Sequence, residues 1–245
     1  MIRFIIIAIL LVIFLIVSIP IQLVMLLIGF VAPDVRDKTS LRIVNWAFGV
    51  VIKLSGIKKT VIGYENVPKD EAVLYVMNHR SIFDIILTYT LMPGLTGFIA
   101  KKEMAKYATL STWMMFLHCE FLDRDNPRKG LNMMKSSVNK IKKGISMAIF
   151  PEGTRNKNTE ETILEFHKGS FKIAEMAGCR IVPVVLNNTS PIFEDHLPAI
   201  KSQHVIIEYM KPIDMTGMGR AEKRELPDKI REQMIQVYHK NQAMI

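Results

Sequence analysis

The chain has 245 residues, of which 49% are hydrophobic and 22% are charged, and its formal net charge is +9. This balance excludes an intrinsically disordered chain, and two cysteines are too few for a disulfide framework or a four-thiolate zinc site. An excess of Lys and Arg favours anionic partners: phospholipid head groups, phosphorylated metabolites or nucleic acid.

The first predicted element is an apolar run of 30 residues, Phe4 to Pro33, without a charged residue. A helix of that length is about 45 Å long, whereas a bilayer core is about 30 Å thick. Pro20 and Gln22 lie inside the run and predict either a kink or a re-entrant helical hairpin. The apolar region of a cleaved signal peptide has only about 7–15 residues, so we expect a retained membrane anchor.

Basic residues follow the anchor and outnumber the acidic Asp34 and Asp37. They are Arg36, Lys38, Arg42, Lys53, Lys58 and Lys59. By the positive-inside tendency we expect the rest of the chain on the cytoplasmic side, in contact with an anionic membrane surface. Helical spacing over 41–57 predicts an interfacial helix. We therefore assign 1–58 to a membrane anchor with an interfacial helix, and 59–245 to a second domain.

Short apolar runs alternate with longer helical patterns in the second domain. The predicted strands are 60–67, 72–78, 96–101, 120–124, 145–150, 180–187 and 204–210. The predicted helices are 82–91, 102–117, 128–143, 168–178 and 221–241, the last interrupted near Pro227. This alternation indicates an α/β fold with a mostly parallel sheet flanked by helices, preceded by the membrane-embedded helical segment.

Polar residues directly after strand 72–78 form the first candidate site. Imidazole is suited to general base catalysis near neutral pH, which makes His79 the first candidate in the chain. Asp84 would fix the ring, but on a regular helix five residues apart diverge by about 140°. Pairing therefore requires a turn at 78–81 before a helix that Ser81 caps. The alternative is a strand-end His and an Asp placed by the helix dipole.

The loop after strand 145–150 offers groups for an anion or a polyol. Glu152 supplies a carboxylate, Gly153 permits close backbone approach, and Arg155 supplies a fork of donors. The alternative is a surface turn with a solvated ion pair.

Basic residues also follow two other strands. Arg124 comes after 120–122 and Lys101 ends 96–101, so both are candidates for phosphate contact, although a lone Arg is more often structural. Pro183 predicts an edge strand or a bulge at 180–187. His118 and Cys119 lack further ligands for a metal, and the Met/aromatic stretch 104–116 suits a core or an acyl-chain contact.

Together and in order, NHRSIFD (78–84), FLDR (121–124), FPEGTRN (150–156) and VPVVLN (182–187) resemble the glycerolipid acyltransferase family typified by 1-acylglycerol-3-phosphate acyltransferase. Asn78, His79 and Asp84 match the family's Asn-His-x-x-x-x-Asp motif, and 150–155 match its Phe-Pro-Glu-Gly-Thr/Ser-Arg motif. Arg124 and Pro183 match the other two motifs. The segment 166–169 matches Phe-Lys-x-Gly only weakly, because its second residue is His.

The resemblance implies acyl transfer from acyl-CoA or acyl carrier protein to the sn-2 hydroxyl of 1-acylglycerol-3-phosphate, giving phosphatidate for phospholipid biosynthesis. It implies His79 and Asp84 as catalytic residues. The implied substrate-binding residues are Lys101, Arg124, Glu152, Gly153, Thr154 and Arg155.

Glu152 would bind a glycerol hydroxyl or order Arg155, and backbone N–H groups near 79–81 would stabilise the oxyanion. No metal, no cofactor and no nucleic acid are expected. The alternatives are an acyltransferase with glycerol-3-phosphate or another lysolipid as acceptor, and a non-catalytic lipid-binding protein, against which the His79–Asp84 pair argues.

Overall fold

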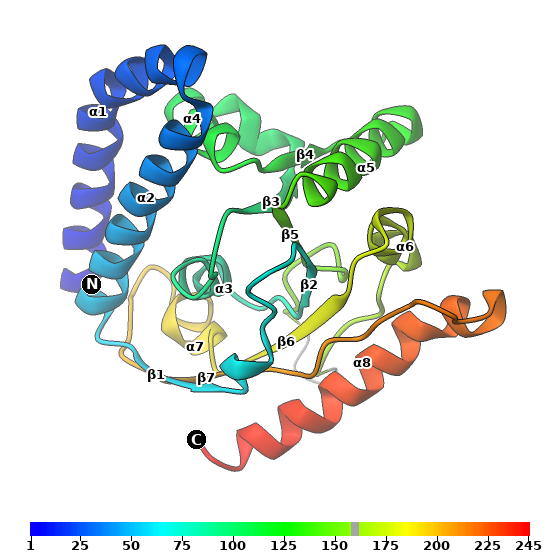
Figure 1. The fold of residues 1–245 in the computed structure, drawn as a ribbon. Coiled ribbons are helices and arrows are strands. Elements are labelled where there is room, and N and C mark those ends of the chain that lie inside the picture. The colour runs from blue at the N-terminus through cyan, green and yellow to red at the C-terminus, as the bar shows by residue number, and fades with distance from the viewer. Residues whose placement is uncertain (158–161) are drawn as a thin grey trace.

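The computed structural model describes residues 1–157 and 162–245, and its centre is one seven-stranded sheet in the order β1-β7-β6-β2-β5-β3-β4 (Figure 1). The strands are β1 (Lys58–Ile62), β2 (Leu74–Met77), β3 (Thr96–Lys101), β4 (Glu120–Leu122), β5 (Ser146–Ile149), β6 (Ile181–Asn187) and β7 (His204–Tyr209). Every neighbouring pair is parallel except β6 and β7. The predicted α/β fold with a mostly parallel sheet is confirmed.

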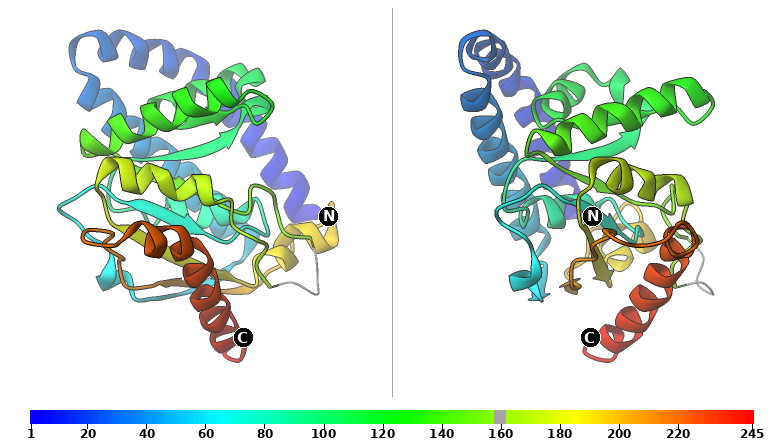
Figure 2. Two further views of the ribbon diagram at one scale, coloured as in Figure 1. Left: turned by 90° about the vertical axis from the view of Figure 1, so that its right-hand side faces the viewer. Right: turned by 45° about the vertical axis from the view of Figure 1, so that its right-hand side comes forward.

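Helices cover both faces of the sheet. They are α1 (Ile2–Val31), α2 (Pro33–Ser55), α3 (Phe83–Tyr89), α4 (Ala108–Phe116), α5 (Pro127–Lys142), α6 (Lys172–Ala177), α7 (Ser190–Phe193) and α8 (Arg220–Gln242). Short 3₁₀ helices also occur: η1 (Tyr64–Asn66), η2 (Lys102–Lys106), η3 (Lys168–Phe171) and η4 (Glu194–His196). Helices α5, α6 and α8 lie on one side of the sheet, while α1, α2 and α4 lie on the other (Figures 1 and 2).

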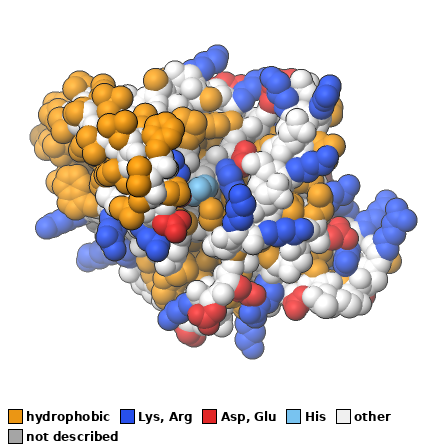
Figure 3. All heavy atoms as spheres, turned by 45° about the horizontal axis from the view of Figure 1, so that its top comes forward, with side chains coloured by type: hydrophobic (Ala, Val, Ile, Leu, Met, Phe, Trp, Pro, Cys, Tyr) orange, Lys and Arg blue, Asp and Glu red, His pale blue; other side chains and the backbone are white. Residues whose placement is uncertain are grey.

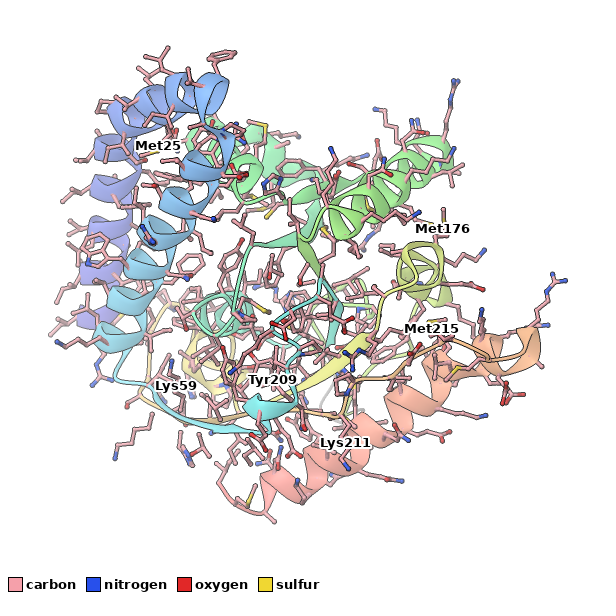
Figure 4. All side chains as sticks on the ribbon, viewed as in Figure 1. Met25, Lys59, Met176, Tyr209, Lys211 and Met215 are labelled. Atoms are coloured by element: carbon pink, nitrogen blue, oxygen red, sulfur yellow. The ribbon has the colours of Figure 1, made fainter. Side chains whose placement is uncertain are left out.

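The central strand β2 shows why its sequence is continuously apolar. Tyr75 and Met77 belong to the core on the α1–α4 side, whereas Leu74 and Val76 belong to the core on the side of α5, α6 and α8. A parallel strand covered on both faces has no solvent-facing side, so its residues do not alternate with polar ones. Figure 4 shows Tyr209, the end of β7, among these buried side chains.

The first two helices form an antiparallel hairpin along one side of the sheet domain (Figures 1 and 2). Helix α1 is continuous through Pro20 and bends on its way to α2, so the turn of the hairpin lies at Ala32, near the end of the apolar run, and not at Pro20 or Gln22. The predicted interfacial helix begins earlier than 41, at Pro33, because proline is well suited to the first helical position. It ends before Gly56, whose positive φ of 70° terminates the helix.

Polar residues of α1 dock the helix onto the sheet domain. Ser18 accepts a hydrogen bond from the indole of Trp113 at 3.1 Å, and Gln22 donates to the carbonyl of Thr109 at 2.8 Å. Met25 lies between α1 and α2 in Figure 4 and is buried. The rest of α1 is largely exposed and apolar, and Figure 3 shows hydrophobic side chains gathered over this end of the molecule with Lys and Arg beside them.

Two predictions about proline residues are wrong: that Pro183 indicates an edge strand or a bulge, and that the last helix is interrupted near Pro227. Strand β6 is an interior strand between β7 and β2 although it contains Pro183. The carbonyl of Pro183 accepts from the N–H of Met210, just beyond the end of β7, so its missing N–H falls where the ladder with β7 has ended. Helix α8 continues through Pro227, which is buried together with Leu226 and Ile230 against the core. This packing offsets the lost helical hydrogen bond.

Two predicted helices are divided. The range 168–178 consists of η3 followed directly by α6. The range 102–117 consists of η2 and α4, which meet at Tyr107. Trp113 and Phe116 of α4 are buried, while Met115 is exposed, so the Met/aromatic stretch lies partly in the core and partly at the surface.

Candidate active site

The predicted functional residues follow the carboxyl ends of strands β2, β5, β3 and β4, which lie side by side in the sheet. Asn78, the first residue after β2, forms two hydrogen bonds with neighbouring β6. Its side chain accepts from the N–H of Leu186 at 2.8 Å and donates to the carbonyl of Leu186 at 2.9 Å. The amide thereby replaces one backbone pair of the ladder and fixes where the chain leaves the sheet.

His79 and Asp84 are in direct contact, as the first motif predicts. Nδ1 of His79 lies 2.8 Å from Oδ2 of Asp84. The carboxylate only accepts hydrogen bonds, so Nδ1 carries the proton and Nε2 is the basic nitrogen. The Asp84 side chain is fully buried and the His79 side chain is 14% exposed. Asp84 therefore holds the ring from the interior while the ring keeps an accessible edge.

The turn that permits this contact is built by Asp84 itself. Oδ2 also accepts hydrogen bonds from the N–H groups of Arg80 and Ser81, each at 2.7 Å. Ser81 Oγ accepts from the N–H of Phe83 at 3.0 Å, but the N-cap of α3 is Ile82, so Ser81 lies one residue before the capping position predicted for it. The prediction that N–H groups at 79–81 stabilise an oxyanion is wrong, because carboxylates already accept from Arg80 and Ser81 and from His79 as well.

Two residues of the loop after β5 position His79 from the other side. The ring of Phe150 stacks on the imidazole with centroids 4.0 Å apart and an angle of 18°. Glu152 is buried, accepts from the N–H of His79 at 2.6 Å and accepts from the N–H of Leu164 at 2.9 Å. The structure thus directs Glu152 to the backbone, and not to Arg155 as one sequence interpretation had it.

Glu152 should make stability depend on pH. Burial raises its pKa from 4.5 to about 7, although the N–H groups of Leu164 and His79 favour the ionised form. Between pH 4.5 and about pH 7 the folded chain therefore binds more protons than the unfolded chain. The contribution of Glu152 to the free energy of unfolding is therefore greatest below pH 4.5, falls as the pH rises to about 7, and is constant above that.

Replacement of Glu152 by Gln should remove this dependence. The difference in unfolding free energy between the wild type and Glu152→Gln should change by up to about 3 kcal/mol across the interval. Thermal unfolding in detergent at several pH values measures it. A difference that is constant with pH would contradict a raised pKa.

Arg124 reaches the same loop from β4, two strands away from β5. Its guanidinium donates to the carbonyl of Gly153. Gly153 has a φ of 71°, and a Cβ at this position would lie 3.0 Å from the ring of His167 and 3.4 Å from Arg124. Only glycine fits both the backbone conformation and the crowding. The candidate residues of two motifs are thereby joined through one carbonyl group.

Arg155 and Thr154 are exposed at the end of this loop. Nη1 of Arg155 forms an ion pair with Oε1 of Glu194 at 3.0 Å. The same oxygen accepts from the N–H of Ile82 at 2.8 Å. Glu194 carries no motif signal, and only the tertiary structure identifies it as a neighbour of the site.

The carboxyl ends of β3 and β4 carry further lysines. Lys101 is exposed at the end of β3, and Lys102 is held by Asp123 and Asp125 at 2.7 Å each. These hydrogen bonds from Lys102 hold the pKa of Asp123 below its ordinary value. Lys102, Lys106 and Lys129 also line a surface hollow of about 350 Å³. Glu103 and Asp123 line the same hollow, and Asp123 pairs with both Lys102 and Lys129, so acidic side chains balance these lysines.

The sequence found the candidate residues but not all their contacts. His79, Asp84 and Glu152 form one hydrogen-bonded group, and Arg124 joins Gly153. The ladder role of Asn78 could have been anticipated from the double hydrogen-bonding capacity of an amide at a strand end. The stacking of Phe150 had no signal beyond its place in the motif.

Comparisons with known proteins identify the family of the chain. A family model described as Acyltransferase matches residues 58–187. The 1-acyl-sn-glycerol-3-phosphate acyltransferase of Saccharomyces cerevisiae is 32% identical over 188 residues, which are 76% of this chain and 61% of that protein. The chain thus spans less than two thirds of that relative. The protein of the same name from Borreliella burgdorferi is 31% identical over 74% of this chain and 72% of its own.

A solved structure shares the fold. The crystal structure of the 1-acyl-sn-glycerophosphate acyltransferase from Thermotoga maritima superposes with a TM-score of 0.82. The match covers 99% of this chain and 95% of that chain at 22% sequence identity. The hairpin of α1 and α2 is therefore included in the shared architecture.

Proposed function

This chain belongs to the acyltransferase family, and we propose from that premise that it transfers a fatty acyl group from a thioester to the sn-2 hydroxyl of 1-acylglycerol-3-phosphate. The product would be phosphatidate for phospholipid biosynthesis. The single observation that carries the proposal is the His79–Asp84 pair, 2.8 Å apart at the carboxyl edge of the sheet beside Arg124 and Arg155. The names of the curated relatives support the choice of acceptor.

The proposed reaction needs no protein nucleophile and no cofactor. Nε2 of His79 takes the proton of the acceptor hydroxyl as its oxygen attacks the thioester carbonyl. The buried Asp84 carboxylate stabilises the imidazolium that forms. When the tetrahedral intermediate collapses, the carbon–sulfur bond breaks and His79 returns the proton to the leaving thiolate. The ester and a free thiol result, whether the donor is acyl-CoA or acyl carrier protein.

Cations at the edge of the sheet would hold the phosphate of the acceptor. Lys101 ends β3, Arg124 follows β4 and Arg155 follows β5, which are three consecutive strands of the sheet. An arginine fork is suited to bidentate contact with phosphate. The carbonyl contact with Gly153 fixes the direction of Arg124 before the substrate arrives. Gly153 and Thr154 would line this site, and Glu152 would hold the loop in place through its hydrogen bonds with the N–H groups of His79 and Leu164.

Replacing Arg124 by Ala should raise the acceptor KM about 10- to 100-fold, because one charge-assisted contact with phosphate is lost. The donor KM should stay within about twofold, since the thioester carries no group that this residue contacts. Steady-state kinetics with each substrate varied in turn measures both constants. Equal increases in the two KM values would remove Arg124 from the phosphate site.

The hairpin would embed in one leaflet of a membrane, with the sheet domain on the cytoplasmic side. Helix α1 is long and apolar enough to cross a bilayer. Its polar contacts through Ser18 and Gln22, however, hold the middle of α1 against α4 of the sheet domain, which favours a helix lying at the interface. A lysolipid that resides in the same leaflet would then meet the site by lateral diffusion.

Purified protein in mixed micelles tests the proposal. We expect phosphatidate from lysophosphatidate with oleoyl-CoA, oleoyl carrier protein, or both. Rejection of lysophosphatidate together with acylation of glycerol-3-phosphate or of another lysolipid would establish the alternative acceptor. Absence of ester formation with every acceptor would contradict an acyltransferase activity.

A further inference from the structure

Glu194 connects two parts of the candidate site, although it lies outside the motifs and outside the range 58–187 that the family model matches. It begins η4 directly after α7. Its Oε1 accepts from the N–H of Ile82, next to the helix that carries Asp84, and pairs with the guanidinium of Arg155. One carboxylate oxygen therefore joins the two loops that follow β2 and β5.

The surroundings of Glu194 do not indicate a role in stability. Its side chain is only 12% exposed, and within the described ranges, 1–157 and 162–245, its buried Oε2 has no hydrogen-bond partner. A buried oxygen without a partner is unfavourable. The Arg155 side chain is 44% exposed, and ion pairs with exposed arginines contribute little to stability. What the pair does achieve is a fixed position for Arg155.

The same segment contacts the membrane helix. Phe193, the residue before Glu194, stacks on Phe4 in the first turns of α1 with ring centroids 5.7 Å apart. Figures 1 and 2 both show the N-terminus of the chain beside α7. A second stack between α1 and the sheet domain, Phe14 on Trp113 at 6.1 Å, involves α4 and no residue adjoining Glu194.

We propose that Glu194 is a positioning residue for the acceptor's phosphate. It holds Arg155 in the orientation that contacts this phosphate, and the Phe4–Phe193 stack makes that orientation depend on the docking of α1. Loss of the contact between α1 and Phe193 weakens acceptor binding while the His79–Asp84 pair stays intact. This inference rests on the function proposed above.

Glu194→Gln tests the ion pair, because glutamine keeps an acceptor for Ile82 and loses the charge. We expect the acceptor KM to rise about tenfold, with the donor KM and kcat each within about threefold of the wild type. Arg155→Ala should produce a similar rise, and the double variant should be no worse than Arg155→Ala alone. The proposal would be overturned if the increase in acceptor KM in the double variant equalled the product of the two single increases. Equal changes in the acceptor KM and the donor KM would also overturn it.

Phe193→Leu tests the link to the membrane helix, with Phe14→Leu as the matched control. Both variants remove an aromatic stack of α1 and keep an apolar side chain of similar size. We expect the acceptor KM to rise several-fold in Phe193→Leu and to stay within about twofold in Phe14→Leu. Equal changes in the two variants would show that no specific link exists.

Far-UV circular dichroism and thermal unfolding check that each variant is folded. If Glu194→Gln does not fold, the comparison of Phe193→Leu with Phe14→Leu still tests the proposal. A wild type that rejects lysophosphatidate contradicts the proposed function by itself. The same variants are then assayed with the anionic acceptor that the wild type uses. The expected changes in the acceptor KM and the donor KM are the same.

Discussion

Replacing His79 by Ala is expected to lower kcat about 10²- to 10⁴-fold and to leave the protein folded. The imidazole is the proposed base for the acceptor hydroxyl, and removing a general base in this position costs about that factor. Acceptor KM should change little, because the proposed phosphate contacts of Arg124 and Arg155 do not involve the ring. Phosphatidate formation in mixed micelles, followed with labelled acyl donor, measures the loss.

His204→Ala is the matched control for this variant. His204 begins β7 at the other side of the sheet, where its Nε2 lies 2.8 Å from the hydroxyl of Thr60. Its replacement removes an imidazole and one hydrogen bond without touching the site, so activity should stay within about twofold. Full activity in His79→Ala would exclude His79 as the base, and the proposed mechanism with it.

Replacing Asp84 by Asn is expected to lower kcat about 10²- to 10³-fold. The amide oxygen can still accept from the N–H groups of Arg80 and Ser81 and from Nδ1 of His79, so the ring keeps its orientation. The charge that stabilises the imidazolium is lost. Stability should also fall by about 1–3 kcal/mol, because the amide NH₂ takes the place of Oδ1, which is buried and has no partner among the described residues.

Asp37→Asn separates these two effects. Asp37 is also buried and also pairs with an imidazole, since its Oδ2 lies 2.7 Å from Nε2 of His118. That pair joins α2 to the turn before β4, away from His79. Asp37→Asn should therefore reduce stability and leave kcat within about threefold, whereas Asp84→Asn should reduce both. Equal kcat losses in the two variants would mean that the Asp84 result reflects folding alone.

Local sequence features were enough to predict most of the elements. The apolar strand 74–77 and the mostly apolar strand 146–149 indicate burial on both faces, and the uncharged run from Phe4 to Pro33 indicates contact with lipid. The motif residues were singled out because they follow apolar strands, where ligands bind in open α/β sheets. Each of them also had a structural explanation, and only the four motifs taken together, as a resemblance to a family, assigned them a function. The pairing of His79 with Asp84 was left open by the residues alone, because it requires a turn at 78–81, and it was implied only by the resemblance to the acyltransferase motif.

Contacts between distant segments were decided by the tertiary structure. Whether Pro183 is tolerated in an interior strand depends on where the neighbouring β7 ends. Whether backbone N–H groups remain available for an oxyanion depends on Glu152, which is 73 residues away from His79 in the sequence.

The role of Glu194 likewise depends on a strand order that brings the ends of β2, β5 and β6 together. The sequence determines which residues are apolar, polar or able to turn, because those properties are local. Which donor meets which acceptor is settled only when the strands are paired, because each buried polar group takes the partner that the packed fold places beside it.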